Sequence, residues 1–198
     1  MTRPKLEFHP LTPDRWPDLE RLFGERGACG GCWCMWWRLP RAAWTARKGA
    51  QNRAAFRELV EAGPAPGIIA YRNGRPVGWC AIAPRESYVV LERSRTLKRL
   101  DDRPVWSVTC LFVERAERRK GVSVELLKAA VQFVKRLGGE CVEGYPVEPG
   151  SKEMPAAFAW TGTAAAFRKA GFTEVARTAA TRPVMRFVLS GASDYSIA

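Results

Sequence analysis

The sequences WSVTCLFV (106–113), ERAERRKGVS (114–123) and VELLKAAVQFVKRL (124–137) form one continuous stretch that decides the expected fold. The first part is β-branched or aromatic at most positions, which is typical of a buried or half-buried strand. The last part repeats apolar side chains at helical spacing and ends at Gly138-Gly139. It therefore predicts a helix with a wide apolar face. That face consists of Val124, Leu126, Leu127, Ala130, Val131, Phe133, Val134 and Leu137.

The charged loop between this strand and helix runs Arg118, Arg119, Lys120, Gly121, Val122 and Ser123. Unpaired N–H groups at a helix start, together with the helix dipole, favour an anion in front of them. Gly121 lets the backbone approach a ligand closely. These properties indicate a phosphate-binding loop, although a solvated basic turn before an ordinary helix has the same composition. The chain contains no G-x-x-x-x-G-K-[ST] motif and no G-x-G-x-x-G after a strand.

The pattern Arg118-x-x-Gly121-x-Ser123 resembles the R/Q-x-x-G-x-G/A signature of the GNAT superfamily of acetyl-CoA-dependent acyltransferases. In that family the signature follows a strand ending in an apolar-apolar-Val run, which here is Leu111-Phe112-Val113. The sequence AAAFRKAGF (164–172) is similar to a second family signature, a short helix that closes with Gly-Phe. Ser123 departs from the usual Gly or Ala. The clear resemblance covers about residues 105–187, with a weaker match from about residue 67.

The resemblance implies a mixed α/β (α+β) fold of the GNAT-like acyl-CoA N-acyltransferase type, with a central, mostly antiparallel sheet flanked by helices. It also implies acetyl-CoA as co-substrate, with its pyrophosphate on the amides of residues 118–123. The pantetheine would pair with the main chain of residues 111–113, and one amide there would polarise the thioester carbonyl. The implied acetyl-CoA-binding residues are Leu111, Phe112, Val113, Arg118, Arg119, Lys120, Gly121, Val122, Ser123, Thr163 and Phe167.

The resemblance further implies direct attack of an acceptor amine on the thioester, without a covalent enzyme intermediate. The family often uses a Tyr as acid four residues before the closing Gly, and this chain has Phe167 there. Tyr145 is therefore a candidate acid and Glu143 a candidate base, on one face of the expected strand 140–147. The alternatives are that Glu143 pairs with an arginine and that Tyr145 is a packed aromatic residue.

The segment CGGCWCMWW (29–37) follows the first expected helix. In GNAT-like folds this region helps to form the acceptor pocket, so the resemblance implies that Trp33, Trp36 and Trp37 line it. Ordinary packing in the core is the alternative. Three cysteines within six residues, Cys29, Cys32 and Cys34, also suggest zinc. A structural zinc site normally needs four ligands, and no second close pair follows, so we expect no metal.

The composition restricts the classes of protein and partner. The chain has 198 residues, of which 46% are hydrophobic, and its net charge is 32 − 20 = +12. This charge favours polyanionic partners, but no basic block is longer than residues 118–120. The acceptor is expected to be a small-molecule or protein amine. A module that binds acyl-CoA or nucleic acid without catalysis is the alternative function.

The sequence shows no signal peptide and no apolar run of the ~18 residues that a membrane span needs, so we expect a cytoplasmic protein with reduced cysteines. A homodimer is left open. We expect a single domain over residues 1–189 and a loose tail over 190–198. The other expected elements are helices at 12–23, 50–62 and 163–170, a hairpin at 67–83, and strands at 174–178 and 184–189.

Overall fold

The computed structural model describes residues 5–148 and 159–189. Seven strands form one sheet in the order β1-β2-β3-β4-β5-β7-β6. Only the β4–β5 pair is parallel within these residues, and the other neighbours are antiparallel. The strands are β1 (Leu6–Pro10), β2 (Gly67–Arg72), β3 (Arg75–Pro84), β4 (Trp106–Val113), β5 (Cys141–Gly144), β6 (Thr173–Ala179) and β7 (Arg182–Val188). The mixed, mostly antiparallel sheet confirms the predicted fold class.

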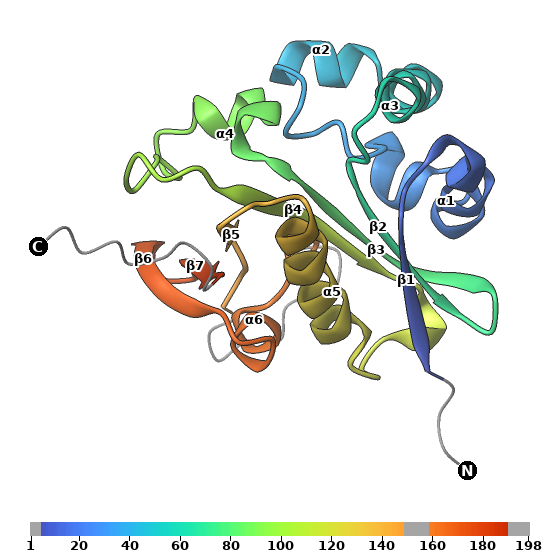
Figure 1. Ribbon diagram of the computed structural model, residues 1–198. Helices are drawn as coiled ribbons and strands as arrows, with labels where there is room; N and C mark the ends of the chain where they lie inside the picture. The colour runs from blue at the N-terminus through green and yellow to red at the C-terminus, as the bar shows by residue number, and fades with distance from the viewer. Residues whose placement is uncertain (1–4, 149–158, 190–198) are drawn as a thin grey trace, which may run out of the picture.

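Helices cover both faces of this sheet (Figure 1). One face carries α1, α2 and α3, and the other carries α5 and α6. The helices are α1 (Trp16–Phe23), α2 (Arg41–Ala46), α3 (Ala50–Ala62), α4 (Val89–Glu92), α5 (Val122–Arg136) and α6 (Ala164–Lys169). Side chains of β2 alternate between the two cores. Ile68 and Ala70 pack toward α5, while Ile69 and Tyr71 pack toward α1 and α3.

The central strand and helix form as their sequences predict. The apolar side chains of α5 are buried over the sheet, among them Leu126, Leu127 and Val134. Leu137 follows the helix end and is 50% exposed, so its place in the predicted apolar face is wrong. Gly138 adopts φ = +75° directly after this residue, which ends the helix as predicted.

Most other predicted elements are confirmed, and the structure contains two elements that the sequence analysis did not predict. The helix at 50–62 and the hairpin at 67–83 are α3, β2 and β3. Thr163 caps α6, because its side chain accepts a hydrogen bond from the amide of Ala166. The sequence analysis missed β1 and α2, which have five and six residues and are too short for a clear periodic pattern. The predicted loose tail lies outside the described residues.

Candidate functional site

The two parallel strands at the centre of the sheet separate partway along their length. β4 and β5 pair only from Trp106 to Val108 opposite Val142 to Gly144. Immediately afterwards the register between β3 and β4 shifts, because Ala81 faces Cys110 while Ile82 faces Val108. Thr109 is therefore the extra residue of a β-bulge, which bends its strand and increases the local twist. An opening in the ladder results at the level of Leu111.

Residues 160–163 lie in this opening. The amide of Leu111 donates a hydrogen bond to the carbonyl of Trp160, with an N···O distance of 2.7 Å. On the other side, the amide of Val147 donates to the carbonyl of Gly162 at 2.9 Å, and Val147 forms a parallel bridge with Thr163. The Leu111 amide thus points out of its strand toward a carbonyl oxygen. The distance from the Leu111 nitrogen to this oxygen falls within the range of about 2.7–3.1 Å that is typical of a donor that stabilises an oxyanion.

The predicted phosphate-binding loop precedes the first turn of α5. Gly121 is the N-cap residue, with φ = +81°, and a Cβ built there has no atom within 4 Å. The first turn of an α-helix offers amides without an intrahelical acceptor, here those of Val122 and Ser123. The dipole of this 15-residue helix adds positive potential at the same place. The backbone of the loop therefore suits a phosphate group.

The three cations of the loop differ in their contacts. The Nε of Arg118 donates to the carbonyl of Val113 at 3.0 Å, so this side chain ties the loop to the end of β4. The ammonium of Lys120 lies 3.4 Å from the buried carboxylate of Glu117. Arg119 is exposed and has φ = +60°. All three keep positive charge beside the start of α5.

Of the predicted acetyl-CoA contacts in the second signature, Thr163 ends the segment 160–163 and Phe167 packs against that segment. Phe167 is fully buried. A Cβ built at Gly144 would lie 2.2 Å from its ring, and one at Gly162 would lie 2.8 Å from it. The ring thus fills the space between the end of β5 and the segment in the opening. Contact between Phe167 and a ligand requires residues 160–163 to move.

The candidate base and acid, Glu143 and Tyr145, belong to a buried polar network. Glu143 is 1% exposed and Tyr145 is 2% exposed. The Tyr145 hydroxyl donates to Glu143 Oε1 at 2.6 Å, and Arg85 Nη1 lies 3.1 Å from the same oxygen. The Nε of Arg186 donates to Glu143 Oε2 at 2.6 Å. Both carboxylate oxygens are therefore occupied.

This placement agrees with the alternative, in which Glu143 pairs with arginine and Tyr145 is packed, and the catalytic roles stay a prediction. A general base must reach the proton that it removes, and both oxygens of this carboxylate already accept hydrogen bonds from buried protein groups. Burial raises the pKa of Tyr145, and the neighbouring Glu143 raises it further, so the hydroxyl stays protonated. Neither side chain faces solvent.

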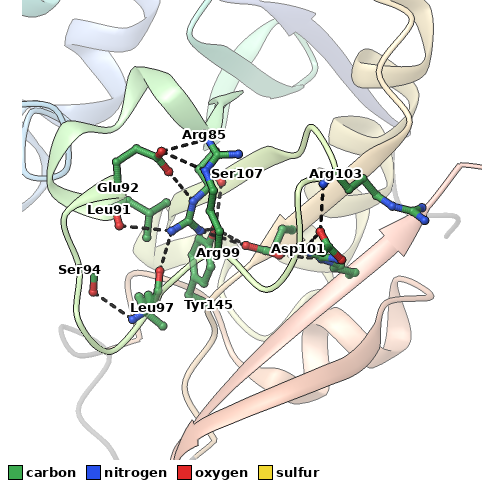
Figure 2. Close-up of polar contacts among 12 residues, drawn as sticks. Arg85, Leu91, Glu92, Ser94, Leu97, Arg99, Asp101, Arg103, Ser107 and Tyr145 are labelled. Carbon is green, nitrogen blue, oxygen red and sulfur yellow. Dashed lines mark hydrogen bonds and ion pairs between the residues drawn. The ribbon is translucent and has the colours of Figure 1, made fainter.

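Arg85 is the centre of this network and was missed by the sequence analysis (Figure 2). It is fully buried, and its Nε donates to Glu92 at 2.6 Å. Its Nη2 donates to the carbonyls of Leu91 and Leu97 at 3.3 and 2.6 Å. Arg85 thus ties the segment after α4 to β5. No sequence signal distinguishes it from the many exposed arginines of the chain.

The ionisable groups predict how stability depends on pH. Hydrogen bonds from Arg186 lower the pKa of Asp101 below its ordinary 3.8, so the stabilisation is present above that pH and is lost on acidification. Burial raises the pKa of Cys32 from 9.0 to about 12 and also raises that of Cys80, so stability falls once the pH exceeds 9.0. We expect a constant free energy of unfolding between about pH 6 and 8 and a decline on both sides.

Chemical denaturation at a series of pH values from about 3 to about 11 measures this dependence. The pH of each inflection should be located to within about half a unit. Cys80→Ala removes one of the thiols whose pKa is raised and should reduce the alkaline decline relative to the native chain. An alkaline decline that is the same in both proteins would contradict the assignment to this buried thiol.

The tryptophans of the 29–37 segment divide between the core and a wall beside the opening. Trp33 is 2% exposed and packs on Trp16 and Phe23, so it is a core residue and not part of a pocket wall. The half-buried rings of Trp36 and Trp37 have centroids 6.3 and 5.9 Å from that of Trp160. Trp160 was missed by the sequence analysis.

The cysteines of the same segment differ in burial, because Cys29 is exposed and Cys32 is half-buried. Cys34 is buried, and its Sγ accepts a hydrogen bond from the indole Nε1 of Trp79 at 3.1 Å. Within residues 5–148 and 159–189, no three His, Cys, Asp or Glu side chains are placed to hold a metal ion. Over the same ranges, none of the helices is both long and apolar enough to cross a bilayer.

Comparison with known proteins identifies the family and the fold of the chain. A sequence model of the acetyltransferase (GNAT) family matches residues 33–151. No curated protein matches the chain. Among solved structures, the polyamine N-acetyltransferase of Drosophila melanogaster is 11% identical, with 93% of this chain and 100% of that chain covered and a TM-score of 0.58.

Two further structures share the fold. An acetyltransferase of the GNAT family from Streptococcus agalactiae is 12% identical, with 94% and 96% of the two chains covered and a TM-score of 0.56. The PaiA N-acetyltransferase of Thermoplasma acidophilum, in complex with coenzyme A, is 14% identical, with 93% and 99% covered and a TM-score of 0.52. At these identities the structures show the fold alone.

Proposed function

The chain belongs to the acetyltransferase (GNAT) family, and we propose that it transfers the acetyl group of acetyl-CoA directly to a primary amine. It is accordingly an acyltransferase with acetyl-CoA as co-substrate. The acceptor is a small-molecule or protein amine, and attack occurs within a ternary complex. Cytoplasmic location and a homodimer stay predictions.

The observation that carries this proposal is the amide of Leu111. It lies beside the β-bulge, points into the opening between β4 and β5, and donates to a carbonyl oxygen at 2.7 Å. The Trp160 carbonyl stands in for a thioester carbonyl in this contact. The proposal therefore assigns the polarising role to Leu111, rather than to Phe112 or Val113.

The residues around the opening have separate roles in this scheme. Acetyl-CoA supplies an activated acetyl thioester when it is bound. The amides of Val122 and Ser123 donate to phosphate oxygens, and Arg119 adds positive charge. The carbonyl of Trp160 must leave the Leu111 amide, so residues 160–163 are displaced during binding. Their displacement also uncovers the Phe167 ring for contact with the bound group.

The proposal does not assign proton transfer to Glu143 or Tyr145. Glu143 and Tyr145 are buried and fully hydrogen-bonded to protein groups. The proposal needs no protein acid beside the leaving sulfur, because a thiolate is a weakly basic leaving group. An acceptor amine can lose its proton to water on its way into the opening.

Isothermal titration of acetyl-CoA into the purified protein tests the proposal, with dephospho-CoA and ATP as controls. We expect stoichiometric binding that prefers acetyl-CoA, followed by formation of free thiol when primary amines are added. The preference arises because only acetyl-CoA offers both the phosphates and the thioester carbonyl. Absence of binding would overturn the proposal and favour the alternative of a non-catalytic module that binds nucleic acid.

A further inference from the structure

An open pocket adjoins the tryptophan wall of the site. Its volume is about 320 Å³. Four apolar residues and two arginines form most of its lining, namely Trp37, Pro40, Val89, Val90, Arg41 and Arg93. It lies where the loop after the 29–37 segment meets α4. The pocket thus combines apolar walls with positive charge.

Neither arginine of this pocket is neutralised by a carboxylate of the described chain. The guanidinium of Arg41 lies 4.6 Å from the ring centroid of Trp36, and Arg93 is exposed. The nearest acidic residue in sequence, Glu92, pairs instead with Arg85 and Arg99. Because arginine stays protonated in proteins, the pocket keeps two positive charges at neutral pH.

The pocket shares Trp37 with the tryptophan wall beside the opening. The carbonyl of Trp37 accepts a hydrogen bond from the amide of Val90 at 3.0 Å, which fixes this residue against α4. Its ring centroid lies 5.9 Å from that of Trp160, whose carbonyl contacts the Leu111 amide. The indole Nε1 of Trp37 is buried and has no acceptor among the described residues. An oxygen of a bound molecule could satisfy it.

We propose that this pocket binds the apolar, carboxylate-bearing end of a small primary amine, whose amino group lies at the Leu111 amide. The inference rests on the proposed acetyl transfer and names the acceptor class for that site. Guanidinium groups match a carboxylate in charge and hydrogen-bonding geometry, and the apolar walls favour an aliphatic or aromatic body. Polycationic amines are disfavoured, because Arg41 and Arg93 repel them.

Matched acceptors test the role of the carboxylate. The compounds 4-(aminomethyl)benzoate and 4-(aminomethyl)benzamide share the amine, the ring and nearly the same shape, but only the first is anionic at the distal end. We expect kcat/KM for the benzoate to exceed that for the benzamide by about tenfold or more. Equal values for the two acceptors would overturn the inference.

Variants test whether the two arginines cause the preference. The double substitution Arg41→Gln with Arg93→Gln should lower kcat/KM for the benzoate by about tenfold and lower that for the benzamide by much less. Arg47→Gln is the matched control, since Arg47 is exposed at the C-terminal end of the same helix and does not line the pocket. A similar loss in this control would assign the effect to overall charge and contradict the pocket.

Direct binding separates failure of this inference from failure of the proposed function. Titration with 4-methylbenzoate and 4-methylbenzamide, neither of which has an amine, needs no acetyl transfer. We expect the benzoate to bind at least about tenfold more tightly, and this difference should disappear in the Arg41→Gln, Arg93→Gln protein. Absence of any preference in the native chain overturns the pocket, whether or not acetyl-CoA binds.

Discussion

Replacing Gly121 with Asp is expected to raise the dissociation constant for acetyl-CoA by about 100-fold or more, because the new carboxylate faces the phosphates. Gly121 caps α5 at the proposed phosphate cradle, where a Cβ has open space. Two like charges about 4 Å apart repel by about 4 kcal/mol near a protein surface, which exceeds the loss expected from shape alone. Isothermal titration measures the change.

Gly121→Asn is the matched control for this substitution. Asn has nearly the same size as Asp, tolerates the left-handed conformation at φ = +81°, and carries no charge. Both residues are good N-caps, so the thermal midpoint should be nearly the same in the two variants. If both variants bind acetyl-CoA equally well, the phosphates do not lie at the start of α5.

Replacing Glu143 with Gln is expected to lower the free energy of unfolding by about 3 kcal/mol or more. The substitution keeps the shape of the side chain but leaves Arg85 and Arg186 facing a neutral amide in a buried network. The Gln amide has only one oxygen, so it cannot accept hydrogen bonds from the two guanidinium groups on two separate oxygens, as the carboxylate does. Denaturation by urea, with the slope held constant, measures the loss.

Glu86→Gln is the control for this variant, because Glu86 is exposed and pairs with Arg99 at the surface. It should cost less than about 1 kcal/mol. The result also tests the catalytic role that the sequence suggested. A Glu143→Gln protein that is as stable as the native chain, binds acetyl-CoA and transfers no acetyl group would support the predicted role of Glu143 as the general base.

The central part of the fold was predictable because its signals are local. Residues 106–137 contain a strand of β-branched and aromatic residues, a turn with Gly121 and a helix with one apolar face. Each property depends on neighbours within a few positions, so the sequence order expresses it directly. β1 and α2 were missed because such short segments depend on pairing and packing with distant residues.

The candidate site likewise has features that follow from local sequence and features that depend on the fold. The sequence by itself predicted an anion-binding loop, since a glycine, three cations and the start of a helix are contiguous at residues 118–123. It also determined the family signature around them. Backbone amides at a helix start act as donors whatever the rest of the fold does. Their role therefore follows from position in the chain.

The tertiary structure alone decided what the remaining candidates do. Glu143 and Tyr145 have the chemistry of a base and an acid, but Arg85 lies 58 and 60 residues away in sequence and binds both in a buried network. Likewise, only the fold places the carbonyl of Trp160 against the amide of Leu111. The role of an ionisable or polar group depends on its burial and on charges within a few ångströms, which chain folding sets.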